Sequence, residues 1–113
     1  MRPYVYEDNA YVVLEGDLNV SRRDEIAAAL PDPKVIKTGV INLSRASYID
    51  SLIIGLLLQF RRTFVEHGGD PNSLMIVLAK EGGVRTIFEM PGLTRLFPTA
   101  FVDVPVGQGH PVG

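Results

Sequence analysis

The 113-residue sequence contains no cysteine and only two histidines. The absence of cysteine excludes a disulfide framework and any thiolate metal site, and two histidines are too few for a His-rich metal site. Eleven basic residues against thirteen acidic residues give a net charge of −2. That balance shows no electrostatic footprint for nucleic acid. We therefore expect no metal, no cofactor and no nucleic-acid partner.

Long hydrophobic runs are also absent. The longest, residues 52–58, is interrupted by Gly55, whereas a helix that spans a bilayer needs about 20 apolar residues. The opening residues, MRPY, lead into mixed polar sequence without the apolar segment of a secretory signal. The lack of cysteine fits a reducing compartment. Together these absences predict a cytoplasmic domain with no direct membrane insertion.

The residues that are present suit a packed globular domain. Apolar residues make up 46% of the chain and charged residues 21%, and the length fits one domain. Strand and helix patterns alternate along it. Strands are predicted at 4–7, 10–15, 35–46, 74–79 and 101–104, and helices after Ser21, over 52–67, over 84–90 and, as one turn, over 93–97. This alternation predicts an α/β fold with a mixed sheet.

The connections carry their own signals. The segment Gly16–Asn19 predicts a turn, and residues 44–49 predict a short loop. Gly68-Gly69 predicts the end of the long helix. No repeat or linker divides the chain, so we expect one domain over residues 1–104. Residues 105–113 show no packing pattern, and we expect a disordered tail there.

The strands at 35–46 and 74–79 have nearly continuous apolar centres. Such strands are typical of a sheet covered on both faces. We expect both to be central, with helices on at least one side. Ser21 is predicted to cap the helix that follows it, with acidic residues in the first turn.

The long helix carries two apolar arcs at 100° per residue. The core arc holds Ile53, Leu56, Leu57, Phe60 and Phe64, and the second arc holds Ile54, Leu58 and Val65. The first two turns are therefore apolar nearly all round. Either a partner protein or a neighbouring helix of the same chain has to cover the second arc. Gly55 permits close approach by another backbone, at a cost of about 1 kcal/mol in helix stability.

Ser51 stands where this helix begins. The usual role of a serine there is to cap the helix. A helix N-terminus also accommodates a phosphate, which would add about −1.5 to −2 charges beside Asp50 and repel an apolar or acidic partner. Nucleophilic catalysis has little support, because His67 lies roughly 24 Å farther along the helix and His110 falls in the expected tail. We predict no catalytic residue.

From residue 10 to 104 the sequence resembles the STAS family, and in particular its small bacterial anti-sigma factor antagonists. Five features carry the resemblance in order. They are Gly16-Asp17-Leu18-Asn19, the strand and loop VINLSRASYIDS, Gly55 within the next helix, Gly68-Gly69 before the next strand, and VRTIFEMPGL followed by Phe97-Pro98.

The resemblance implies a STAS-like α/β sandwich, with a mixed, mostly parallel sheet flanked by about four helices. It implies a binding protein and not an enzyme. Ser51 takes the position of the family's phosphoacceptor, and the partner is an anti-sigma factor of the serine kinase type. Phosphorylation ends the binding and a phosphatase restores it. The partner surface carries over to Asn19, Asp50, Ser51, Leu52, Ile54, Gly55 and Leu58.

Two departures keep other functions open. Asn19 stands where the family often has aspartate, and Leu52 and Ile53 replace the small residues that often follow the Asp-Ser pair. The bulkier helix start motivates a second hypothesis, a non-phosphorylated scaffold subunit of a transporter or stress-signalling complex. A third hypothesis, a small hydrolase that uses Ser51, lacks a general base.

Overall fold

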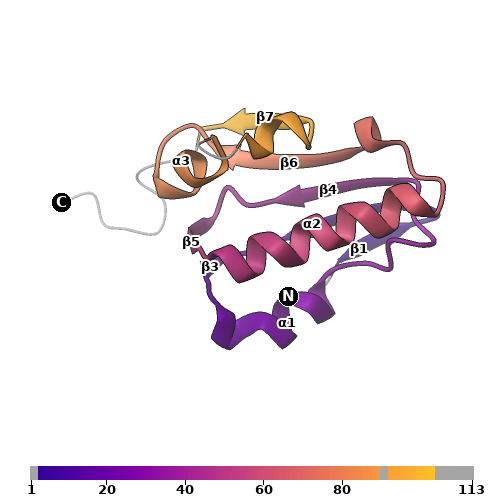
Figure 1. Cartoon of the computed structure of the whole chain (residues 1–113), viewed down its shortest axis with the longest axis horizontal. Coiled ribbons are helices and arrows are strands. Elements are labelled where there is room, and N and C mark those ends of the chain that lie inside the picture. Colours follow the sequence, from indigo (N-terminus) through magenta and orange to yellow (C-terminus); the bar gives the residue numbers. More distant parts are fainter. Residues whose placement is uncertain (1–2, 90–91, 104–113) are drawn as a thin grey trace.

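The computed structural model describes residues 3–89 and 92–103 (Figure 1). Over these residues the chain forms seven strands, three α-helices and three single turns of 3-10 helix. The strands are β1 (Tyr4–Tyr6), β2 (Asn9–Val13), β3 (Gly16–Leu18), β4 (Thr38–Asn42), β5 (Ala46–Ile49), β6 (Leu74–Ala79) and β7 (Thr99–Val102). The helices are α1 (Arg23–Ala29), α2 (Ser51–Glu66) and α3 (Gly83–Glu89), with 3-10 turns η1 (Val20–Arg22), η2 (Pro71–Ser73) and η3 (Leu93–Arg95). The expected tail, 105–113, lies outside the described residues.

The strands form one large and one small sheet. The large sheet has the order β1-β2-β4-β6-β7, and the small one pairs β3 with β5. Only β1 and β2 are antiparallel; all other neighbours run parallel. The prediction of a mixed, mostly parallel α/β sheet is confirmed. The expected fourth helix, over 93–97, is the 3-10 turn η3. The described residues therefore contain three α-helices, where about four were predicted.

In the part of the chain that the structure describes, helices cover only one face of the large sheet. In β6, Leu74, Ile76 and Leu78 are buried, whereas Met75 between them is 36% exposed. The same alternation runs through β4, and α2 extends along the buried face (Figure 1). The prediction of helices on at least one side of the sheet is therefore confirmed, but the cover on both faces that is typical of such apolar strands is not found among the described residues. An apolar run along a strand does not tell which of its two alternating faces receives a helix.

Helix α2 packs as its core arc predicts. Ile53, Leu57, Phe60 and Phe64 are buried, and only Leu56 of the arc is half-buried. The helix then ends as Gly68-Gly69 predicts. Gly68 adopts a left-handed φ of +90°, its N–H donates to Val65 at 3.1 Å, and the Gly69 N–H donates to the carbonyl of Phe64 at 2.8 Å. These two bonds form a Schellman motif.

Three segments differ from their sequence prediction. The expected turn at Gly16–Asn19 is largely strand β3, and the expected strand 35–46 is confined to β4. The expected loop at residues 44–49 contains strand β5. The pairing of β3 with β5 buries Leu18 and Ile49. Glycine, aspartate and asparagine indicate a turn over a short window. The strand depends instead on a partner about 30 residues away, which a local pattern does not contain.

Candidate functional site

Asp50 joins three segments at one end of the molecule. It lies between β5 and α2, and its N–H donates to the carbonyl of Leu18 at the end of β3, at 3.1 Å. Its Oδ1 accepts the N–H of Ile53 at 3.0 Å, which caps α2, and its Oδ2 accepts the N–H of Val20 at 2.8 Å. One carboxylate therefore holds the first turn of α2 against the connection that leaves β3.

Ser51 is consequently not the helix cap. Asp50 has the extended backbone of a cap residue, and Ser51 is the first residue of α2. The prediction that Ser51 caps the helix is wrong because aspartate caps at least as well and stands one position earlier. Ser51 is exposed, and its hydroxyl makes no hydrogen bond with any residue that the structure describes. This hydroxyl is free to meet another molecule.

Two other exposed serines lie near this end of the molecule, and both have engaged hydroxyls. The Ser21 Oγ donates to Asn19, and the Ser47 Oγ donates to Asp17 Oδ1 at 2.7 Å. The chain contains five serines, and the remaining two are only partly exposed. Ser51 is therefore the serine whose hydroxyl is both exposed and unengaged.

Asn19 caps the turn η1 beside the site. Its side-chain oxygen accepts the N–H of Ser21 at 3.0 Å, and its backbone is extended. The prediction that Ser21 caps the following helix is wrong, because α1 begins at Arg23 without a side-chain cap. An asparagine oxygen accepts this bond as well as an aspartate does. The departure at Asn19 therefore preserves the local fold.

Arg22 also stabilises this region, through contacts that sequence reasoning did not predict. Its guanidinium donates to the carbonyls of Glu15 and Asp17 at 2.8 and 2.9 Å and to the Glu25 carboxylate at 3.0 Å. The hydrogen bond between the two side chains raises the pKa of Arg22 and lowers the pKa of Glu25. Because two of the acceptors are main-chain carbonyls, no pattern of residue types could reveal the contact.

The predicted partner surface is partly exposed and partly packed. Leu52 is 60% exposed and Gly55 is exposed, whereas Ile54 and Leu58 are half-buried against the core. The chain therefore covers much, but not all, of the second arc by itself. The first turns bring together an unengaged hydroxyl, a capping carboxylate and an exposed leucine. We define Asp50, Ser51, Leu52 and Gly55 as the α2 entry surface.

This arrangement presents a hydroxyl but does not activate it. His67 follows the far end of the 16-residue α2, and its Nδ1 contacts the carbonyl of Thr63 at 3.0 Å. That end is about 24 Å from Ser51 by helix rise. His110 lies outside the described residues.

Within the described part of the chain, no group of three or more His, Cys, Asp or Glu residues could hold a metal ion. None of its helices has the length and apolar character needed to cross a membrane.

Gly55 gives a test of whether this surface is free. A Cβ built at Gly55 meets no atom within 4 Å. Gly55→Ala should therefore raise the free energy of unfolding by about 0.5–1 kcal/mol, measured by urea denaturation, because alanine favours the helix. The matched control, Gly68→Ala, should destabilise, since Gly68 has a φ of +90°. Destabilisation by Gly55→Ala would contradict an open surface.

Two solved structures are similar to this chain. One is the anti-sigma factor antagonist SpoIIAA in its unphosphorylated form, with a TM-score of 0.55, 18% identity, and coverage of 90% of this chain and 86% of that one. The other is the Bacillus cell fate determinant SpoIIAA in its phosphorylated form, with a TM-score of 0.59, 21% identity, and coverage of 91% and 88%. The chain therefore has the SpoIIAA fold, and the STAS-like architecture predicted from the sequence is confirmed.

No model of a protein family matches the chain, and no curated protein sequence does either. At 18–21% identity the two structures establish the fold and not the role.

Proposed function

We propose that this protein is an anti-sigma factor antagonist that binds an anti-sigma factor of the serine kinase type and is switched off when that kinase phosphorylates Ser51. The observation that carries the proposal is the exposed, unengaged Ser51 hydroxyl at the start of α2. It occurs in a fold shared with SpoIIAA, a protein solved in phosphorylated and unphosphorylated forms. The proposal treats residues 1–104 as the single domain responsible.

Docking relies on the apolar character of the α2 entry surface. Full burial of a leucine contributes about 1.5–3 kcal/mol, and Leu52, at 60% exposed, retains roughly 1–2 kcal/mol of that for a partner. Gly55 lets a partner backbone come close, because no side chain stands above it. Ile54 and Leu58 border the surface with half-buried side chains, and Asn19 holds the adjoining turn.

Phosphorylation would reverse this character without unfolding the chain. The first turn of α2 has N–H groups and a positive dipole end that accommodate a phosphate. The Asp50 carboxylate already accepts two N–H groups and stays in place as the cap. A phosphate adds about −1.5 to −2 charges beside it. A partner that docks on the apolar part of this surface then faces two adjacent negative groups, which costs several kcal/mol.

The exposure of Ser51 would also allow the phosphate to be removed, which restores the active form. A phosphate on the first residue of α2 would remain at the surface, within reach of a phosphatase. ATP and sigma factors are cytoplasmic, so the proposal places the protein in the cytoplasm. The Ser51 site itself supplies no catalysis in this scheme; the kinase and the phosphatase do.

The phosphoacceptor is tested by mass spectrometry. Incubation with a serine-kinase anti-sigma factor from the same genome and ATP should add one phosphate, mapped to Ser51. Ser51→Ala should abolish the labelling. Ser21→Ala and Ser47→Ala should leave it unchanged, because those hydroxyls are engaged by Asn19 and Asp17. Labelling that persists in Ser51→Ala would refute the assignment.

The switch is tested separately by Ser51→Asp. This variant should weaken kinase binding by at least tenfold in a calorimetric titration. The matched control is Ser47→Asp, on the neighbouring strand β5, which should weaken kinase binding less. Equal binding by wild type and Ser51→Asp would instead favour a scaffold that ignores the state of this serine.

A further inference from the structure

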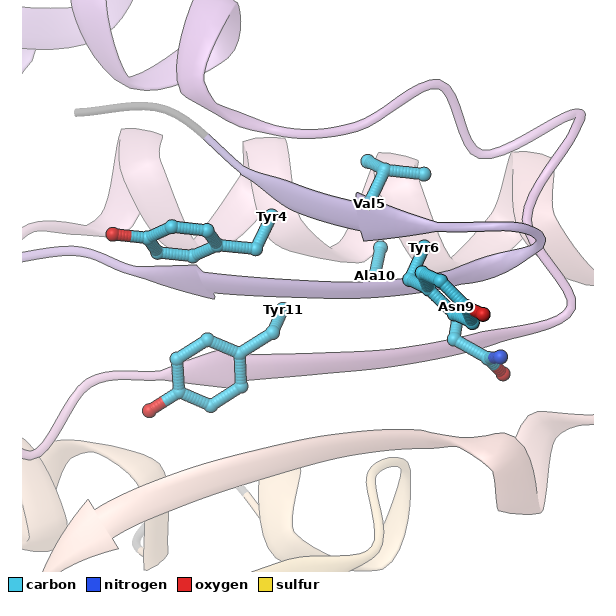
Figure 2. A pocket seen from close by; sticks show the side chains of 6 residues that line it. All are labelled: Tyr4, Val5, Tyr6, Asn9, Ala10 and Tyr11. Atoms are coloured by element: carbon cyan, nitrogen blue, oxygen red, sulfur yellow. The ribbon is translucent and has the colours of Figure 1, made fainter.

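The large sheet has an open face opposite α2. Strand register places on it one residue in two from each strand. We define the open face by these side chains: Tyr4, Tyr6, Asn9, Tyr11, Val13, Thr38, Val40, Asn42, Met75, Val77, Ala79, Ala100 and Val102. None of them carries a charge. Figure 2 shows Tyr4 and Tyr11 side by side on β1 and β2. Their ring centroids lie 6.5 Å apart.

The exposure of this face is large for so small a protein. Tyr4 and Tyr6 are 73% and 76% exposed, and Tyr11 is 39% exposed. Since a tyrosine presents about 150–250 Å², these three alone offer roughly 400 Å². A hollow of about 410 Å³ lies among the residues of β1 and β2 that surround them (Figure 2). The largest apolar patch on a small protein is typically about 300–600 Å² and is often an interaction site.

Four polar side chains at the centre of the open face, Asn9, Tyr11, Thr38 and Asn42, are already paired with each other. The Asn42 Nδ2 donates to the Tyr11 hydroxyl at 2.8 Å, and the Thr38 hydroxyl donates to the Asn9 side-chain oxygen. The Asn42 Oδ1 accepts the N–H of Ser44 at 2.9 Å. Removing this face from water would therefore leave these donors and acceptors satisfied, which lowers the cost of burial.

We propose that the open face binds the open face of a second copy of this chain, so that the two sheets stack about 10 Å apart around a two-fold axis. Charge favours this occupant. A neutral face meets its own copy without like-charge repulsion, and two acids at its rim, Asp8 and Asp103, pair with Lys37 and Lys80 of the same chain. An anionic lipid surface would require unpaired basic residues at that rim.

The buried area also fits a dimer. With the aliphatic side chains added to the tyrosines, two copies would bury on the order of 1,000 Å², the lower limit for a specific interface. The expected affinity is therefore modest. Because α2 lies on the other side of the sheet (Figure 1), both Ser51 hydroxyls stay accessible, and the dimer would offer two α2 entry surfaces.

The test is sedimentation velocity on the full chain over about 1 µM to 1 mM. The mass should rise toward twice the 12.4 kDa of one copy. Met75→Lys should weaken association at least tenfold, because the two-fold axis introduces the charge twice. Tyr6→Lys should do the same, and because the Tyr6 side chain is 76% exposed the substitution removes little buried contact. Val35→Lys is the matched control, since Val35 is 66% exposed outside the open face.

Several results would overturn the proposal. One is a single-copy mass at every concentration, and another is a dimer that survives Tyr6→Lys. Dimerisation only after removal of residues 104–113 would show that this segment of the same chain occupies the face. Binding to phosphatidylcholine vesicles without self-association would assign it to lipid. Ser51→Asp should leave the dimer intact, so this result and that of the kinase experiments are independent.

Discussion

Leu52→Glu is expected to weaken binding of the kinase partner by roughly 100-fold while leaving the protein folded. Leu52 is 60% exposed, so its loss removes little core packing. The substitution forfeits the leucine's contribution to docking and leaves a carboxylate facing an apolar partner, together about 3 kcal/mol. An acid in the first turn of α2 also suits the helix dipole, so thermal stability should not fall. Calorimetric titration and a melting curve measure the two quantities.

The matched control for this prediction is Val35→Glu. Val35 is 66% exposed and lies between α1 and β4, away from the α2 entry surface. Val35→Glu introduces the same charge as Leu52→Glu and should leave binding of the kinase partner unchanged. Wild-type affinity in Leu52→Glu would contradict the α2 entry surface as the docking site, whereas a loss in both variants would reveal a general effect of charge.

Asp50→Ala is expected to lower the free energy of unfolding by about 1–3 kcal/mol. It removes the cap of α2 and leaves the N–H of Val20 without its carboxylate acceptor. For a domain of this size that corresponds to a fall in melting temperature of roughly 5–15 °C. Differential scanning calorimetry gives both values.

Two variants calibrate this result. Asp50→Asn keeps an oxygen that accepts the Ile53 N–H but removes the negative charge. Its free energy of unfolding should therefore lie between those of the wild type and Asp50→Ala. Ser51→Ala should have the melting temperature of the wild type, because the Ser51 hydroxyl has no hydrogen-bond partner among the described residues. An unchanged melting temperature in Asp50→Ala would mean that Asp50 does not hold the site together.

Local and periodic features of the fold were predictable from the sequence. The core arc of α2 follows from apolar spacing, and the end of the helix follows from Gly68-Gly69, where a left-handed residue is required. The strand nature of Gly16–Leu18 was not predictable, because it depends on pairing with β5. Whether β4 and β6 are covered on one face or on both was not predictable for a related reason. It depends on where the helices pack, which strand composition does not report.

The candidate site shows the same division. The sequence pattern correctly predicts that a helix starts at Asp50 and Ser51, but it favours the serine as the cap. The structure reverses those roles, because Asp50 is within hydrogen-bonding distance of both Ile53 and Val20. That reversal matters for function: a capping serine would have its hydroxyl engaged. The contact of Arg22 with main-chain carbonyls had no counterpart in any motif.

The most direct test compares one protein in two states. The kinase partner is titrated into wild-type chain that is unphosphorylated, and into the same chain carrying one phosphate on Ser51, with circular dichroism confirming that both are folded. We expect the phosphorylated form to bind at least tenfold more weakly, with unchanged secondary structure. Equal affinities for the two folded forms would contradict it.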